Sequence, residues 1–166
     1  LALNYVCKRL ITDTTLSAET ASGLLERILP AHILTAGVEE LSGDAVGDRR
    51  YIPIPLYAAP SSKRVRRVLD HPVLTRLQLV PQLLLYRSTT PGGVHTLFEH
   101  VIGSYALMLR ALGKLLSQPL FRVLFWQKEL EEAQLAILLS RVGSFPFDRI
   151  VNSIDPLTRD QKRADL

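Results

Sequence analysis

The spacing of hydrophobic side chains predicts helices over most of the chain. Between residues 98 and 112, apolar residues recur every three or four positions, which is the pattern of an amphipathic helix, and Gly113 predicts its end. A longer helix is predicted over 121–139, with Leu130 and Ile137 inside and its charged side chains outside. These two helices form the centre of the predicted fold.

Shorter helices are predicted before them. Ser17 has the chemistry of an N-cap, and the leucines and isoleucines after it predict a helix that runs toward Leu34. A helix is also expected to begin at residues 60–62 and to end at His71, because the residue before a proline avoids the helical region. Residues 73–80 follow as a short, mostly buried helical segment.

The remaining segments are rich in proline, glycine and small polar residues. Prolines alternate with apolar residues over 51–56 and indicate an edge strand or an extended arm, since proline cannot donate a hydrogen bond within a sheet. Loops or turns are predicted at 42–49 and 89–93, and a break at 142–147 followed by a short helix over 146–153. The sequence therefore predicts a mainly α fold with a short extended or β segment near residues 50–57.

Composition limits the class of protein. The chain has 166 residues, of which 47% are hydrophobic, and this is enough to bury a core and too much for a disordered chain. Its apolar runs are too short to span a membrane, and its single cysteine, Cys7, excludes a disulfide framework or a cysteine zinc site. We therefore expect no membrane partner and a cytoplasmic location. Because the first residue is Leu1, we also expect a processed or partial chain.

Positive charge is concentrated in the second part of the chain. Residues 1–60 hold five Lys and Arg against seven acids, whereas residues 61–166 hold fifteen against nine. The densest basic patch is the run Lys63, Arg64, Arg66 and Arg67, which makes it the best candidate for a nucleic acid. The run has no interleaved aromatic residues, so a solvated helix face is the favoured explanation and any nucleic-acid binding would be weak.

Two blocks of sequence resemble the HD-domain metal-dependent phosphohydrolases, in particular the branch of deoxynucleoside triphosphate triphosphohydrolases. The first block comprises Leu-Asp-His-Pro-Val-Leu-Thr-Arg-Leu at 69–77, Pro-Gln-Leu at 81–83 and Pro-Gly-Gly-Val-His-Thr-Leu-Phe-Glu-His at 91–100. The second is Leu-Leu-Ser-Arg-Val-Gly-Ser-Phe-Pro-Phe at 138–147. The resemblance implies an HD-like helical bundle over 50–153 that is shorter than the family's domain. The residue pattern outside it predicts an N-terminal helical arm over 1–49 and, because acids and bases alternate there with few apolar residues, a mobile tail over 154–166.

The resemblance also implies a metal site, and this chain departs from it. His100 falls on the first metal ligand of the family, but Ser140 and Arg141 replace the adjacent His-Asp pair and Ser144 replaces a catalytic histidine. A serine hydroxyl is a weak ligand, and a guanidinium beside a cation would repel it by about 4 kcal/mol at 4 Å. We therefore expect no bound metal and no catalytic residue. If the chain were active, the resemblance would imply Mn, Fe, Ni or Mg as the cofactor.

Other family positions point to a nucleotide. Gln82 and Leu83 match a pair that contacts nucleotide in the triphosphohydrolases, and Arg76 and His95 complete a candidate nucleotide or phosphate pocket by the same resemblance. A structural role for Arg141 is a further hypothesis. Its guanidinium would pair with Glu99 or Asp148 and hold the helices together in place of the cation.

Three functions follow from these observations. The first is a degenerate HD domain, a pseudoenzyme that acts as a non-catalytic scaffold or as a nucleotide- or phosphate-binding subunit. The alternatives are a working metal-dependent phosphohydrolase that acts on nucleotides, and a basic nucleic-acid-binding module. Since the bundle is short for the family, we also expect a homo-oligomer or a subunit of a larger complex.

Overall fold

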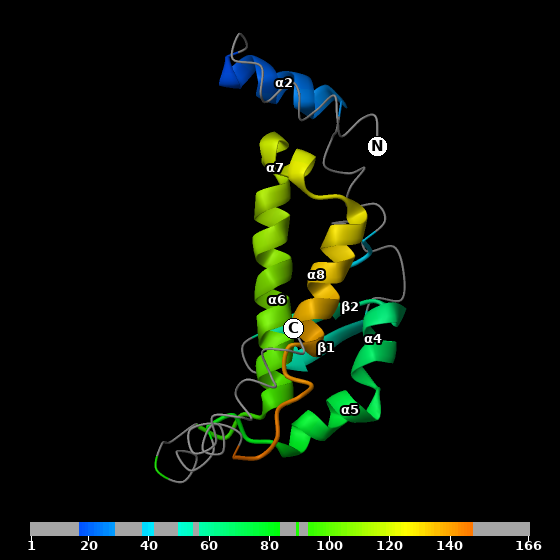
Figure 1. Ribbon diagram of the computed structural model, residues 1–166, viewed down its shortest axis with the longest axis vertical. Helices are drawn as coiled ribbons and strands as arrows, with labels where there is room; N and C mark the ends of the chain where they lie inside the picture. The colour runs from blue at the N-terminus through cyan, green and yellow to red at the C-terminus, as the bar shows by residue number, and fades with distance from the viewer. Residues whose placement is uncertain are drawn as a thin grey trace, which may run out of the picture.

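Two antiparallel helices form the centre of the molecule in the computed structural model. The long helix α6 (Leu97–Leu116) runs beside α8 (Gln127–Leu139), with a strand hairpin and short helices packed on one side (Figure 1). The structure describes residues 17–28, 38–41, 50–54, 57–83, 89 and 93–147. The described part is mainly helical, as the hydrophobic spacing predicts.

Helix α6 begins at a reciprocal cap. The Glu99 amide donates to Thr96 Oγ1 at 3.2 Å, and the Thr96 amide donates to Glu99 Oε2 at 2.7 Å. At its other end, the predicted stop at Gly113 is wrong, because the helix continues to Leu116. The Leu116 side chain is buried, and its burial offsets the low helix propensity of one glycine.

The predicted single helix over 121–139 is two helices. α7 (Pro119–Leu124) ends before an extended pair, Phe125 and Trp126, and α8 follows. The Trp126 amide donates to the side chain of Glu129 at 3.0 Å, which satisfies one free donor at the start of α8. Phe125 stacks on Phe121 with ring centroids 4.6 Å apart, so the break is stabilised by aromatic packing.

The proline-rich segment forms one strand of a hairpin. β1 (Arg50–Ile54) pairs antiparallel with β2 (Tyr57–Ser61), and Ile52 lies opposite Ala59. The strand at β1 is confirmed, whereas β2 was not predicted because alanine and proline have low strand propensity. Ala59 is fully buried and joins the core beneath the hairpin, so packing on α6 decides the conformation of this segment.

Three short helices follow the hairpin: α4 (Lys63–Leu69), α5 (Pro72–Thr75) and the 3-10 helix η1 (Arg76–Leu79). The side chain of Ser62 caps α4 and that of His71 caps α5. Leu74, Leu77 and Val80 are buried as predicted. The prediction that the whole segment is mostly buried is wrong at two positions. Val73 is 38% exposed, and Leu79 is 84% exposed on the outer side of the tight 3-10 turn.

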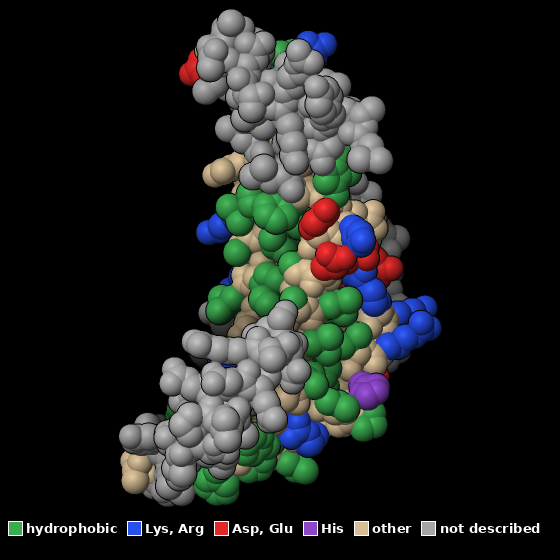
Figure 2. Space-filling view, in the orientation of Figure 1, with side chains coloured by type: hydrophobic (Ala, Val, Ile, Leu, Met, Phe, Trp, Pro, Cys, Tyr) green, Lys and Arg blue, Asp and Glu red, His purple; other side chains and the backbone are tan. Residues whose placement is uncertain are grey.

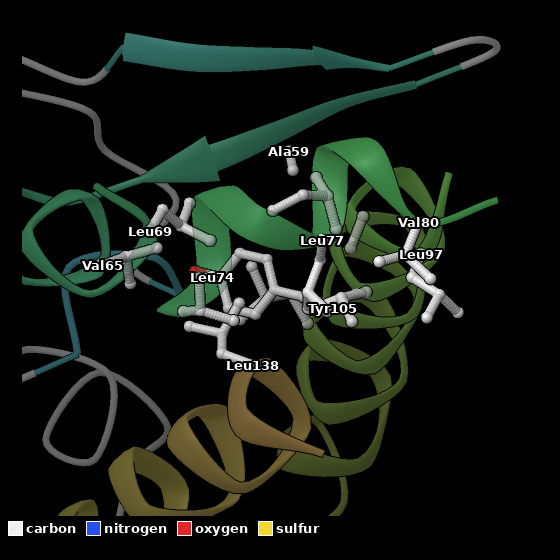
Figure 3. Close-up of a cluster of buried hydrophobic side chains, with 13 residues drawn as sticks. Ala59, Val65, Leu69, Leu74, Leu77, Val80, Leu97, Tyr105 and Leu138 are labelled. Carbon is white, nitrogen blue, oxygen red and sulfur yellow. The ribbon is translucent and has the colours of Figure 1, made fainter. Parts of the chain in front are cut away.

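The main core lies between the hairpin, the short helices, α6 and α8 (Figure 3). Its fully buried side chains include Leu77, Ile102, Tyr105 and Leu138. The Tyr105 hydroxyl donates to the carbonyl of Pro60 at 3.2 Å, which satisfies the only polar atom of that side chain and attaches α6 to β2.

The N-terminal helix lies at the far end of the molecule. α2 (Ala18–Ile28) begins at Ser17, whose hydroxyl accepts from the Thr20 amide at 3.3 Å, and this confirms the predicted cap. α2 packs against α7 (Figure 1). The predicted extension to Leu34, the loop at 42–49, most of the predicted helix at 146–153 and the tail at 154–166 lie outside the described residues.

Candidate functional site

The positions that match the family's metal site share one end of the α6–α8 pair. Because the helices are antiparallel, the first turn of α6 and the last turn of α8 lie at the same end (Figure 1). His100 is in the first turn of α6, and Ser140 and Arg141 directly follow α8. The fold therefore brings the two sequence blocks together.

The chain after α8 forms consecutive turns. The Ser140 amide and hydroxyl both donate to the carbonyl of Ile137, at 3.2 and 2.7 Å. The Val142 amide donates to Leu139 at 3.0 Å, and the Ser144 amide donates to Arg141 at 3.0 Å. The Ser140 hydroxyl thus binds its own helix, and Ser144 is buried. We call residues 140–144 the α8 turn.

Arg76 attaches the α8 turn to the start of η1. Its Nη1 donates to the carbonyl of Ser144 at 2.8 Å and its Nη2 donates to the carbonyl of Val142 at 2.6 Å. Hydrogen bonds from an ionised donor are short and stronger than neutral ones. We call this contact the Arg76 tie. The sequence assigns Arg76 to a phosphate pocket, but both terminal nitrogens of its guanidinium already donate to the backbone.

Arg141 does not make the contact that the sequence suggested for it. Its side chain is exposed, and no ion pair joins it to Glu99, whose carboxylate instead caps α6. The proposed pairing with Glu99 is therefore wrong, and the reason is that the capping box already uses this carboxylate. The other suggested partner, Asp148, lies outside the described residues.

The donors at this end of the molecule do not fit a metal ion. His100 is half-buried and supplies one imidazole. The carboxylate of the adjacent Glu99 caps α6, and the α8 turn supplies only hydroxyls and a guanidinium. No group of three or more His, Cys, Asp or Glu side chains comes together within the described ranges. Divalent cations of the kind that the resemblance implies need several imidazoles or carboxylates, so these side chains alone would not hold one.

The candidate nucleotide residues lie beside one another. The Gln82 amide donates to the carbonyl of His95 at 3.1 Å, next to an antiparallel bridge between Pro81 and Thr96. Gln82 Oε1 is buried and has no hydrogen-bond partner. Gln82, Leu83 and His95 are all half-buried. The structure thus brings residues 81–83 and 93–100 of the first sequence block together. It leaves the acceptor Gln82 Oε1 without a hydrogen-bond partner.

The basic run does not form one uniform cationic face. Lys63 and Arg67 are exposed, whereas Arg66 donates from Nε and Nη2 to Ser61 Oγ at 3.1 and 3.2 Å. Arg64 Nη1 lies 2.8 Å from Glu131 Oε2. Two of the four side chains are thus engaged with the protein itself, which reduces the charge that the run offers to a phosphate backbone.

Arg64 is the centre of a partly buried polar cluster that the sequence did not reveal. Besides Glu131, its guanidinium lies 3.5 Å from Glu40 Oε2 and donates to Gln134 Oε1 at 3.3 Å. The carboxylate of Glu40 is only 1% exposed. We call Arg64, Glu40, Glu131 and Gln134 the Arg64 cluster. One signal in the sequence could have indicated that the side-chain amide of Gln134 is buried. Gln134 lies four residues after Leu130 and therefore on the same apolar face of the helix.

The Arg64 cluster affects the protonation of the adjacent Tyr105 and of its own member Glu131. Burial raises the pKa of Tyr105 far above its usual value, the Glu40 carboxylate raises it further, and the Arg64 guanidinium opposes both. A hydrogen bond from Gln127 lowers the pKa of Glu131, and Arg64 lowers it further. Tyr105 therefore stays neutral and Glu131 stays ionised at neutral pH.

A buried arginine connects the far end of α6 to α2. Arg122 is 3% exposed, and it donates to the carbonyls of Leu116 and Ser117 and to Glu26 Oε2, the last at 2.7 Å. The predicted sites do not include it. A basic residue in a short apolar helix is the signal that could have found it.

Searches of protein-family models, curated proteins and solved structures found no match to this chain. In the part of the chain that the structure describes, no helix has the length and apolar character needed to cross a bilayer.

Proposed function

We propose that this chain is a non-catalytic, HD-like helical domain that acts as a scaffold or interaction subunit. The observation that supports it is the Arg76 tie, since it places a fixed guanidinium against the turn that would carry metal ligands in the family. The tie joins η1 to the α8 turn without a metal. Ser140, Arg141 and Ser144 are the remaining side chains of that turn with polar groups, and none supplies a carboxylate or an imidazole.

A phosphohydrolase of this class needs a metal-bound hydroxide to attack phosphorus. The experiment is phosphate release from each of the four deoxynucleoside triphosphates with Mn²⁺, Fe²⁺, Ni²⁺ or Mg²⁺. We expect no release above the protein-free control, and the matched His100→Ala variant should be indistinguishable from the unaltered chain. Turnover that His100→Ala abolishes would contradict the proposal and support a working phosphohydrolase.

Nucleotide binding without hydrolysis is the second candidate. The buried, unpaired Gln82 Oε1 supports it, because a buried acceptor gains from any donor that reaches it, such as the amino group of a base. Titration with a deoxynucleoside triphosphate, followed by amide chemical shifts, tests this candidate. It predicts shifts at Gln82 and His95 that Gln82→Ala removes. Shifts that are absent, or that persist in Gln82→Ala, would contradict it.

A scaffold also needs a surface for its partner. Leu107 and Leu115 lie about two helical turns apart on α6, and their side chains are 56% and 38% exposed. We propose that the chain self-associates or joins a complex through this part of α6. Light scattering should then show a dimer or larger species that Leu107→Lys dissociates. A monomer at micromolar concentration would contradict self-association.

A further inference from the structure

A large apolar pocket lies between α4, α5 and α8, next to the Arg76 tie, because Val142 both lines the pocket and accepts from Arg76. Its volume is about 470 Å³, and its wall is formed by aliphatic side chains such as Leu74, Leu135 and Leu139. Pockets that bind small organic ligands have volumes of about 300–1,000 Å³ and walls that are mostly apolar. The size and lining of this pocket are therefore those of a ligand site.

The rim of the pocket leaves apolar side chains in water. Val73 is 38% exposed and Leu139 is 48% exposed. Figure 2 shows hydrophobic side chains gathered on this face beside a histidine and several basic side chains. Covering this surface with an apolar ligand would remove it from water, which is favourable in proportion to the area covered.

The polar groups of the pocket are basic. Arg67 and His71 line it together with the aliphatic side chains, and among the described residues Arg67 makes no ion pair or side-chain hydrogen bond. His71 Nδ1 accepts from the Val73 amide at 3.3 Å, so its Nε2 is the nitrogen that remains to donate. No acidic side chain lines the pocket. The charge of the rim is therefore complementary to an anion.

We propose that this pocket binds a small amphiphilic anion, with an apolar chain or ring between Leu135, Leu139 and Leu74 and an acidic head group at Arg67 and His71. The guanidinium and the imidazole N–H both donate to such a head group, and the guanidinium also pairs with its charge. This proposal rests on the pocket alone. It holds whether or not the chain belongs to the HD-domain class.

The probe for the experiment is decanoate, compared with decanol and decyltrimethylammonium, which have the same chain but a neutral and a cationic head group. Binding is followed by amide chemical shifts, below the micelle concentrations of the two charged compounds and below the solubility limit of decanol. Decanoate should shift the amides of α4, α5 and the end of α8 saturably. Decanol should bind about tenfold more weakly, since it lacks the charge-assisted contacts.

Two variants and one control locate the site. Arg67→Glu reverses a charge at the rim and should weaken decanoate binding by more than about tenfold, with little effect on decanol. Leu139→Glu should weaken both. Lys63→Glu makes the same charge change at an exposed position of α4 that does not line the pocket, and it should leave both affinities unchanged.

Several results would overturn the proposal. One is that decanoate produces no saturable shifts, and another is that all three compounds bind equally. A third is that Lys63→Glu and Arg67→Glu have the same effect, since general attraction of anions by a basic surface would then explain the binding. Because Arg67 is exposed, its variant should fold even if Leu139→Glu does not. Self-association that occupies this face and excludes decanoate would also overturn it.

Discussion

Arg76 and Arg64 each connect parts of the molecule that are far apart in sequence, but they do so in different chemical surroundings. Arg76 reaches a carbonyl 68 residues away, and Arg64 reaches an amide 70 residues away. The partners of Arg76 are neutral backbone oxygens, whereas those of Arg64 include two carboxylates, one of them buried. The Arg64 cluster therefore depends on charge balance and the Arg76 tie does not.

An arginine between two segments can therefore do one of two things: it can neutralise a buried carboxylate, or it can donate hydrogen bonds to backbone carbonyls. In the Arg64 cluster, the guanidinium neutralises Glu40, which would otherwise be a buried and uncompensated charge. At the Arg76 tie, the guanidinium supplies positive charge and donors to a turn whose own side chains lack carboxylates. The first role stabilises the packing of α4 on α8. The second fixes the α8 turn where the sequence resemblance implies a metal.

The largest effect is expected at Arg64. Arg64→Ala leaves the buried carboxylate of Glu40 without its cation, and removal of one partner of a buried pair costs about 3–5 kcal/mol. Because Arg64 is itself partly exposed, we expect a loss of about 3 kcal/mol in the free energy of unfolding. Urea denaturation measures it. Arg64→Ala should cost much less in a Glu40→Gln background, and equal costs in both would contradict the cluster.

A smaller loss is expected at Arg76. Arg76→Ala removes two hydrogen bonds from a charged donor to backbone carbonyls and should lower the free energy of unfolding by about 1–3 kcal/mol. The matched control is Arg141→Ala, at an exposed arginine in the same turn, which should change stability by less than about 0.5 kcal/mol. If Arg141→Ala costs more than Arg76→Ala, the assignment of the tie is wrong.

A substitution at Gly113 provides a control for these stability measurements, because it changes no contact of Arg64 or Arg76. A methyl group added there would meet no atom within 4 Å, and the position is inside α6. Gly113→Ala should raise the free energy of unfolding by about 0.5–1 kcal/mol, because glycine loses more backbone entropy in a helix. The gain should be the same in the unaltered chain and in the Arg76→Ala and Arg64→Ala variants. A loss of stability would show that α6 ends near Gly113, as the sequence predicts.

The smallest effect is expected when the pH is lowered. The stability cost of Arg64→Ala should change with pH, and that of Arg76→Ala should not. The pKa of Glu131 is lowered in the folded chain, so this carboxylate stabilises the fold above its ordinary pKa of 4.5, and that stability is lost as the pH falls through the lowered value. The Gln127 hydrogen bond is the main cause of this lowering and Arg64 contributes part of it. The cost of Arg64→Ala should therefore shrink modestly in acid, while the cost of Arg76→Ala, whose partners are neutral carbonyls, should not. Denaturation at several pH values checks it, and parallel changes in the two costs would contradict the distinction.

The helices could be predicted from sequence wherever a periodic apolar face coincides with burial. α6 is the clearest case, because its apolar stripe packs on the core and a capping box marks its start. The errors arose where packing outweighs local preference. The hairpin strand β2 forms because Ala59 is buried against α6, and the break at Phe125 and Trp126 forms because aromatic stacking and the Glu129 cap stabilise an extended pair.

For the candidate site, the sequence could predict which residues lie near one another but not which contacts they make. The sequence placed His100 and Ser140 at one site, and the fold brings α6 and α8 together there. It did not identify Arg76 as the residue that holds the α8 turn. Every residue has a backbone carbonyl, so the residue types do not show which carbonyls accept from a distant side chain. It also missed Glu40, whose burial depends on contacts with α4 and α8 that no local pattern records.

The central claim is that this end of the molecule is held by Arg76 and not by a metal. Thermal unfolding of the purified chain, measured with excess chelator and then with excess Mn²⁺, tests it most directly, since a ligand that binds only the folded state raises the melting temperature. We predict the same melting temperature in both conditions and a lower one for Arg76→Ala. A melting temperature that falls with chelator and recovers with Mn²⁺, in a manner that His100→Ala abolishes, would contradict the claim.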